Sequence, residues 1–289
     1  MDPRRIVVEV TEEELLGDID VFSRIIAKYR SAGCMLAIDD FGKGSGSIDR
    51  IAYINPDIIK IDKSIVQRVD VQQSFFDVCR AMSAFGDVSG FDLLFEGVET
   101  PFQLERCVAA KGRYFQGFVF SPARPEIDSG FENRDLLNDL LCLKVYRDRV
   151  KLDQRNNIQV ELGQTIEQLR PVIPMEEKRL ADRNSLAELG KALPYYCIRC
   201  FICDSDGRQL SPVVNLGPRR QVTATDYTSS AWLFHEFFER GVDALHCGHK
   251  GFLSNLYKTV ESKQDVVTYM HELRSDRLLC VDIMSSYLS

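Results

Sequence analysis

Residues 1–125 repeat one unit, in which a short apolar run is closed by a charged residue and followed by an amphipathic stretch. The runs recur roughly 20 to 35 residues apart, about the size of one strand-and-helix unit. Each run is almost continuously apolar, as expected of strands that are buried on both faces. The alternation predicts an α/β fold with a parallel sheet covered by helices. The five expected strands lie at residues 6–8, 35–38, 58–61, 93–95 and 118–120.

Helix signals lie between these runs. Apolar residues from Val21 to Tyr29 have helical spacing, and Gly33 suits the position after the helix end. A second helix is expected over residues 75–85, closed by Gly86. Thr100 followed by Pro101 and Gln103 forms a capping box with proline at the first helical position. That pattern predicts a third helix ending near Gly112.

The second half of the chain has a different organisation. Residues 129–170 predict a long helix that is broken at Pro171, and residues 175–193 predict another. Strands are expected at 196–203, 266–270 and 278–283, a turn at 204–207, and a helix at 231–240. We therefore expect a small α+β domain, and place the boundaries at 1–127, 128–193 and 194–289.

Composition excludes several classes of protein. The 289 residues contain 36 basic and 43 acidic residues, a net charge of −7, which argues against a nucleic-acid-coating protein. With 45% hydrophobic residues, global disorder is excluded. No apolar run approaches the roughly 20 residues of a membrane span. An odd count of nine scattered cysteines favours reduced thiols, and we expect a cytosolic protein.

Acidic residues stand at the ends of the expected strands. Glu9 follows the first run, Asp39 and Asp40 the second, and Glu96 the fourth, while Lys60 lies within the third. In a parallel α/β barrel such side chains converge on one face, where a ring of carboxylates requires a cation. Mg²⁺ or Mn²⁺ beside a lysine suits phosphodiester hydrolysis. Taken singly, each acid could instead be a helix cap or a solvated residue.

Five motifs follow one another in the first half of the chain: Glu9-Val10-Thr11-Glu12, Ile38-Asp39-Asp40-Phe41-Gly42-Lys43-Gly44, Ile59-Lys60-Ile61-Asp62-Lys63-Ser64, Glu96-Gly97-Val98-Glu99-Thr100 and Gln116-Gly117-Phe118-Val119-Phe120-Ser121. In this order they resemble the C-terminal half of the EAL domain, the cyclic di-GMP phosphodiesterase family. The resemblance implies a partial (β/α) TIM-type barrel over residues 1–127 that hydrolyses cyclic di-GMP to pGpG with Mg²⁺ or Mn²⁺.

The same resemblance implies roles for individual residues. Glu9, Asp39 and Asp40 are the implied metal ligands. Lys60, Glu96 and Glu99 are the implied catalytic residues, and Gln116 is implied to bind substrate; Glu12 is implied to anchor the loop after Asp40, a loop that couples metal binding to dimerisation in the family. This loop departs from the family pattern at Lys43, Ser45 and Gly46.

The chain begins just before Glu9, so the signature that names the family, an asparagine ligand and a phosphate-binding arginine are absent from this sequence. A barrel lacking those strands has open edges. We expect a fragment, a wrongly placed start or a half-barrel completed by another chain, and no appreciable hydrolysis by this chain alone. The alternative is a non-catalytic cyclic di-GMP-binding or dimerising regulatory protein. Some other metal-dependent barrel enzyme is a third interpretation.

The C-terminal part resembles the EAL-associated domain that follows a long helix in some EAL proteins, with a PAS/Cache-like sensor fold over residues 194–289. The implied roles are sensing an unknown small ligand and forming a homodimer; a structural dimerisation module is the alternative. A metal site is one interpretation of the closely spaced cysteines Cys197, Cys200 and Cys203. Strand alternation would put Cys200 on the opposite side from the other two, which favours packed thiols.

Overall fold

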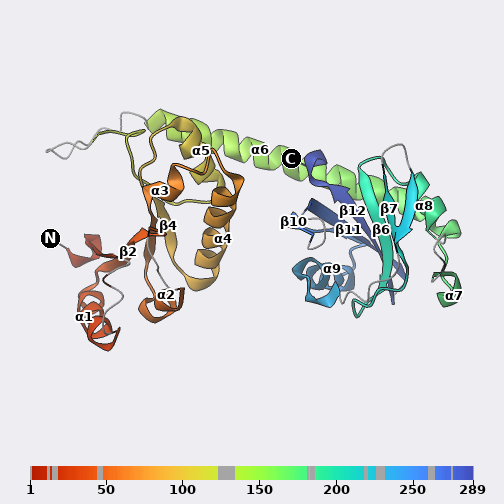
Figure 1. Cartoon of the computed structure of the whole chain (residues 1–289), viewed down its shortest axis with the longest axis horizontal. Coiled ribbons are helices and arrows are strands. Elements are labelled where there is room, and N and C mark those ends of the chain that lie inside the picture. The colour runs from red at the N-terminus through yellow and green to blue at the C-terminus, as the bar shows by residue number, and fades with distance from the viewer. Residues whose placement is uncertain are drawn as a thin grey trace. The chain divides into compact units, whose positions relative to one another are not determined.

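The structure is a computed structural model that describes residues 2–11, 14, 19–43, 48–122, 134–180, 182, 186–217, 221–225, 232–259, 264–274 and 276–288. It divides into two compact units, Met1–Tyr146 and Arg147–Ser289 (Figure 1). Each unit has its own buried apolar residues, so each is described by itself.

The N-terminal unit contains a parallel sheet of five strands whose spatial order follows the sequence, β1-β2-β3-β4-β5. This order is the one that successive strand-and-helix units produce. The strands are β1 (Val7–Thr11), β2 (Met35–Phe41), β3 (Ile58–Ile61), β4 (Asp92–Phe95) and β5 (Tyr114–Phe115); the helices are η1 (Pro3–Arg5), α1 (Ile19–Ala32), α2 (Ile48–Ile54), α3 (Lys63–Val66), α4 (Gln73–Ser89) and α5 (Pro101–Ala109).

Two expectations for this unit are wrong. The fifth strand is not at residues 118–120, which form a turn, but at Tyr114–Phe115, where the chain pairs with Leu94 and Phe95. Helix α4 continues through Gly86 and is capped by Gly90 in the left-handed conformation. A Cβ at Gly86 would lie 2.5 Å from the carbonyl oxygen of Phe91, so this glycine allows close packing rather than ending the helix.

Two helix-end signals are confirmed. Gly33 follows α1 with φ of 94°, the left-handed conformation expected after a helix end. Thr100 and Gln103 form both hydrogen bonds of the capping box, and Pro101 begins α5. Local sequence therefore fixes where these helices begin and end.

A helix of 36 residues, α6 (Arg134–Leu169), has residues in both units. It is followed by η3 (Arg170–Val172), which contains Pro171. The expected single helix at 175–193 is instead two short ones, α7 (Glu177–Leu180) and α8 (Ala187–Ala192), with Asp182 and Leu186 outside helices. Leu180 and Leu186 are both fully buried in the same core, and the break allows both to reach it.

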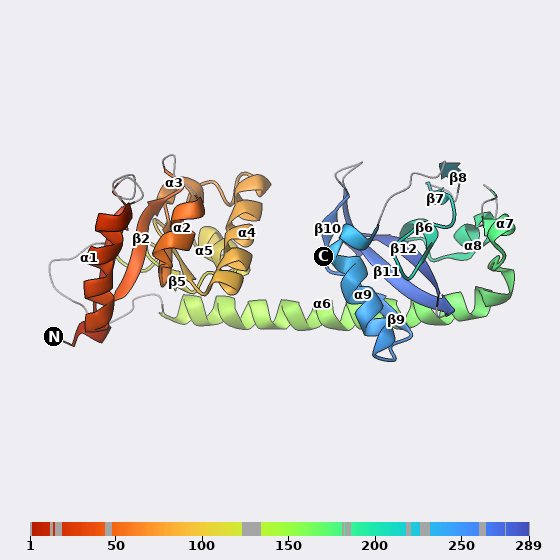
Figure 2. The same cartoon turned by 90° about the horizontal axis from the view of Figure 1, so that it is seen from below.

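The C-terminal unit is built on an antiparallel sheet ordered β10-β11-β12-β6-β7-β8, with β9 also pairing β11. One face packs against α6 and α8, and the other against η5 and α9 (Figures 1 and 2). The elements are β6 (Cys197–Asp204), β7 (Val213–Leu216), β8 (Val222–Thr225), η5 (Trp232–Phe234), α9 (Glu236–His246), β9 (Gly251–Leu253), β10 (Tyr257–Lys258), β11 (Asp265–Arg274), β12 (Arg277–Met284) and η6 (Ser285–Tyr287).

The cysteines of β6 do not alternate as expected. Cys197 and Cys200 both belong to the core on the α6 face, whereas Cys203 belongs to the core on the α9 face. The cause is a register shift between β6 and β12, where Arg199 pairs with Asp282 but Cys197 pairs with Ile283. The extra residue, Ile198, reverses the side to which Cys197 points. The three thiols still do not converge on one point.

No helix in the described part of the chain is both long and apolar enough to cross a membrane. The long helix α6 carries charged side chains along its whole length and so does not meet that condition.

Candidate functional site

The candidate site lies at the carboxyl ends of the parallel strands of the N-terminal unit. Glu9 lies on β1, Asp39 and Asp40 on β2, Lys60 on β3, and Glu96 directly after β4. Because these strands are parallel and adjacent, their carboxyl ends meet at one edge of the sheet. The register brings Asp39 opposite Thr11 and Lys60 opposite Leu94.

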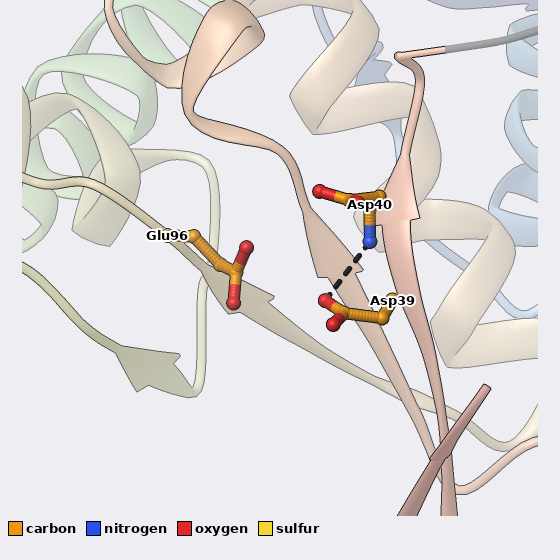
Figure 3. A group of neighbouring side chains, drawn as sticks. All are labelled: Asp39, Asp40 and Glu96. Carbon is orange, nitrogen blue, oxygen red and sulfur yellow. Dashed lines mark hydrogen bonds between the residues drawn. The ribbon is translucent and has the colours of Figure 1, made fainter. Parts of the chain in front are cut away.

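A bulge in β2 turns two consecutive carboxylates toward the same site. Successive side chains of a regular strand point to opposite faces. Here the pairing of β2 with β3 shifts between Ile38 and Phe41, and Asp40 has φ of 57°, in the left-handed region. The backbone N–H of Asp40 donates to Oδ1 of Asp39 at 2.9 Å, and both carboxylates lie toward Glu96 (Figure 3). Bulges that re-aim side chains are frequent next to active sites.

Lys60 lies at the centre of the acidic residues. Its Nζ is 2.9 Å from Oε2 of Glu9, 2.9 Å from Oδ1 of Asp39 and 2.9 Å from Oε1 of Glu96. The Lys60 side chain is only 7% exposed. Burial alone would lower its pKa, but the hydrogen bonds that Lys60 donates to these three carboxylates outweigh burial and raise the pKa above its usual value. Lys60 therefore carries a positive charge.

The carboxyl group of Glu96 has a pKa above its usual value. Burial raises its pKa, and the repulsion from Asp39 and Asp40 acts in the same direction, while Lys60 opposes both. Gly97, which follows, has φ of 64°, and a Cβ there would lie 2.5 Å from Cβ of Lys63. The turn that presents Glu96 thus requires glycine.

The donor atoms of the site fit a divalent cation. One carboxylate oxygen from each of Asp39, Asp40 and Glu96 lies within 4.8 Å of the others. Hard oxygen donors of this kind suit Mg²⁺, Mn²⁺ or Ca²⁺. Glu9, the third expected metal ligand, is not in this group and instead contacts Lys60. Glu96, expected as a catalytic residue, is in it.

The remaining expected site residues lie farther out. Glu99 is exposed and accepts a hydrogen bond from Nε2 of Gln67 at 3.3 Å, and Gln116 is exposed just after β5. Glu12 lies outside the described residues, as do Ser45 and Gly46. Lys43, which departs from the family pattern, lies 3.4 Å from Oδ2 of Asp40.

Asp62 is a site residue that sequence reasoning left without a role. It caps α3, with its Oδ1 accepting from the backbone N–H of Ser64 at 2.8 Å. Burial raises its pKa, but the bonds from Ser64, the contact with Asp40 and the charge of Lys43 outweigh burial and lower it. The position of Asp62 directly after Ile61, at the end of β3, is the sequence signal that could have predicted its place in the site.

Residues 1–123, which contain the parallel α/β sheet and the lysine held by three carboxylates at its strand ends, match the EAL domain family. Residues 131–289, more than half of the chain, match the EAL-domain associated signalling protein domain. The chain belongs to this family of EAL-domain associated signalling proteins.

A relative that matches along nearly all of the chain is YkuI of Bacillus subtilis, an uncharacterized EAL-domain containing protein. It is 28% identical over 290 residues, which cover 98% of this chain and 70% of YkuI. The crystal structure of YkuI in complex with substrate c-di-GMP and calcium superposes with a TM-score of 0.81 at 25% identity, over 99% of this chain and 70% of that one.

The N-terminal unit also matches two proteins whose names describe them as a cyclic di-GMP phosphodiesterase and a probable one. The cyclic di-GMP phosphodiesterase RocR of Pseudomonas aeruginosa is 31% identical over 126 residues, 44% of this chain and 32% of RocR. The probable cyclic di-GMP phosphodiesterase PdeB of Escherichia coli is 33% identical over 128 residues, 44% of this chain and 24% of PdeB. The chain thus spans a third or less of these two relatives.

Proposed function

We propose that the N-terminal unit binds cyclic di-GMP at the carboxylate cluster around Lys60, and that it supplies the metal and base residues for hydrolysis of this nucleotide to pGpG. One observation carries the proposal: three carboxylates converge on a buried, charged lysine at the carboxyl ends of parallel strands. The matches to YkuI and RocR support cyclic di-GMP as the ligand.

Asp39, Asp40 and Glu96 would hold Mg²⁺ or Mn²⁺, with Glu9 beside them. The chemistry that such a cation supplies is activation of water and neutralisation of phosphate charge. Lys60 presents a fixed positive charge to a phosphate oxygen or the attacking water. The Glu96 carboxylate oxygen that does not hold the cation would accept a proton from that water. Glu99 and Gln116, both exposed at the rim, contact the nucleotide.

Calorimetry and product analysis test this proposal. We expect cyclic di-GMP to bind in the presence of Mg²⁺ and binding to weaken at least ten-fold in Asp39→Asn. Asp92→Asn is the matched control, because Asp92 lies at the opposite end of β4 and pairs with Arg113 at 2.9 Å. No binding by the parent chain, or equal losses in both variants, would contradict the proposal. Chromatography of the nucleotide then separates binding from cleavage to pGpG.

The second candidate function is a non-catalytic cyclic di-GMP receptor. It is favoured by the contact between Nζ of Lys43 and Asp40 at 3.4 Å, which gives this carboxylate an ammonium partner of its own. A lysine there competes with a cation for Asp40. Binding of cyclic di-GMP that is independent of Mg²⁺, without formation of pGpG, would favour this candidate.

The C-terminal unit is proposed as a PAS/Cache-like sensory domain that regulates the first unit. Support comes from its antiparallel sheet, in which the first strand, β6, lies between β7 and the last strand, β12, with α9 packed on one face. A homodimer is proposed as well, because α6 exposes Leu141, Leu143, Val145 and Tyr146. Sedimentation of Val145→Asp tests it: a persisting dimer would exclude this contact.

A further inference from the structure

A row of polar side chains crosses the sheet of the C-terminal unit. Each member stands directly opposite the next on neighbouring antiparallel strands, so all of them lie on the same face. This is the face that α9 covers. The row runs from β8 through β7, β6 and β12 to β11, and its members are Thr223, Asn215, Arg199, Asp282 and Thr268.

The centre of the row, formed by Arg199, Asp282 and Thr268, is costly to bury, whereas Asn215 is partly buried and Thr223 is exposed. The side chain of Asp282 is 0% exposed and that of Arg199 is 14% exposed. Nε of Arg199 and Oγ1 of Thr268, at 2.6 Å, both donate to the Asp282 carboxylate. The next row on this face is apolar and contains Phe201, Cys280 and Met270. Apolar side chains in place of a buried ion pair generally give equal or greater stability, so the polar row calls for a reason other than stability.

A pocket of about 380 Å³ lies over the half of the row that runs from Thr223 to Arg199. That volume lies within the range of small-molecule sites. The polar lining residues are Arg199, Asn215 and Thr223 of the row, with Thr259 and Gln264 at the strand ends. The rest of the lining is Ile198, Leu216, Gly217 and Val266. At the other end of the row, Thr268 bonds to the hydroxyl of Tyr257 at 2.8 Å, so that end is closed by protein groups.

The polar side chains that line the pocket indicate which class of ligand it can bind. Two amides and two hydroxyls both donate and accept hydrogen bonds, which suits hydroxyl groups. The one charged lining residue is Arg199, and its charge is compensated by Asp282. An anionic ligand would therefore find no free positive charge in the pocket, and a cationic ligand would be repelled by the guanidinium group. We propose that this pocket binds a small uncharged polyhydroxylated molecule, a monosaccharide or cyclic polyol, across Arg199, Asn215 and Thr223.

The inference deepens the proposed sensory role of the C-terminal unit and rests on that proposal for its biological meaning. Asp282 acts as a positioning residue, because its bond to Nε fixes the plane of the Arg199 guanidinium. Binding can be measured without cyclic di-GMP. A sugar that binds but leaves cyclic di-GMP binding unchanged would support the pocket assignment and contradict the regulatory coupling.

Calorimetry on the full chain tests the inference with four probes of similar size: glucose and myo-inositol, which are neutral, gluconate and glucosamine. We expect a neutral probe to bind most tightly. Asn215→Ala and Thr223→Val should each weaken its binding about ten-fold. Asn255→Ala is the control, because this polar residue lines a separate pocket of about 160 Å³ beside Tyr257. Circular dichroism verifies that each variant is folded.

Three outcomes would overturn the inference. One is that neither neutral probe binds. Another is that gluconate or glucosamine binds more tightly than both neutral probes. The third is that Asn255→Ala weakens binding while Asn215→Ala and Thr223→Val, both folded, do not.

Discussion

The backbone N–H of Asp40 bonds to the side chain of Asp39 at 2.9 Å, so the second residue of the pair holds the carboxylate of the first. The pair lies within a bulge, and Asp40 adopts a left-handed conformation that is uncommon outside glycine. Backbone geometry, and not only residue type, therefore creates two neighbouring carboxylates in a single strand. The predictions below begin with the lysine that neutralises this cluster.

Replacing Lys60 by methionine should destabilise the N-terminal unit by about 2 kcal/mol in the absence of metal, because the carboxylates lose their shared cation. The variant should also gain more stability from Mg²⁺ than the parent chain, since the cation then relieves a larger repulsion. Thermal unfolding with and without Mg²⁺ measures both effects. Lys111→Met, at an exposed pair with Asp87, is the control and should change stability by less than about 0.5 kcal/mol, with or without Mg²⁺. Equal effects of the two substitutions would show that the burial of Lys60 does not matter.

Gly97→Ala should destabilise the unit by about 2 kcal/mol, combining left-handed strain with a contact of 2.5 Å to the Lys63 side chain. Gly90 provides a matched control. It has φ of 83°, but an added Cβ meets no atom within 4 Å, so Gly90→Ala should cost about 1 kcal/mol. Urea unfolding compares the two. A Gly90 variant as unstable as the Gly97 variant would remove the contact with Lys63 as a cause.

Stability of the C-terminal unit should fall as the pH drops below about 6.5, the ordinary pKa of histidine. Burial lowers the pKa of His271 in the folded state, and this outweighs the opposing hydrogen bond with Glu167. The unfolded state therefore binds a proton first, and its protonation draws the equilibrium toward unfolding. Denaturant unfolding between pH 7.5 and about 5 measures the slope.

The groups facing His271 are the Tyr269 hydroxyl at 3.2 Å from Nδ1 and Glu167 at 3.3 Å from Nε2, with the charges of Arg170 and Lys250 nearby. His271→Gln, which cannot be protonated, should show a shallower loss of stability over the same range. An unchanged slope would assign the pH dependence to carboxyl groups.

Thiol reactivity should separate the cysteines by burial. Cys142 and Cys247 are exposed and should react rapidly with Ellman's reagent in the native protein. Burial raises the pKa of Cys79 and of Cys200 to about 12, so these thiols should react only after unfolding. Counting the fast-reacting groups, then repeating the assay on Cys142→Ser with Cys247→Ser, checks the assignment. Rapid reaction in the double variant would point to Cys34, which is partly exposed.

The positions of the site residues could be predicted from the sequence because they depend on a local rule. An apolar run of four residues or so ends at the edge of a sheet, and parallel strands share that edge. Glu9, Asp39, Lys60 and Glu96 follow this rule. The capping box at Thr100 is equally local.

The features that escaped prediction depend on backbone irregularity or on distant pairing. The residues around Ile198 do not predict the bulge that turns the Cys197 side chain to the other face of the sheet. The bulge arises from the register in which β6 pairs with β12, a strand more than 80 residues later in the chain. The pair of Arg199 and Asp282 is hidden for the same reason. The prediction that the helix ends at Gly86 is wrong because the sequence alone does not distinguish a glycine that permits close packing from one that ends a helix.

Helix α6 contributes apolar residues to the cores of both units. Leu136, Leu137 and Leu140 pack against the first, while Ile158, Leu162 and Ile166 are buried in the second. The amides at the two ends of this helix should therefore exchange with solvent at rates set by the opening of different units. Amide exchange measured along this one helix should therefore report the opening of each unit separately.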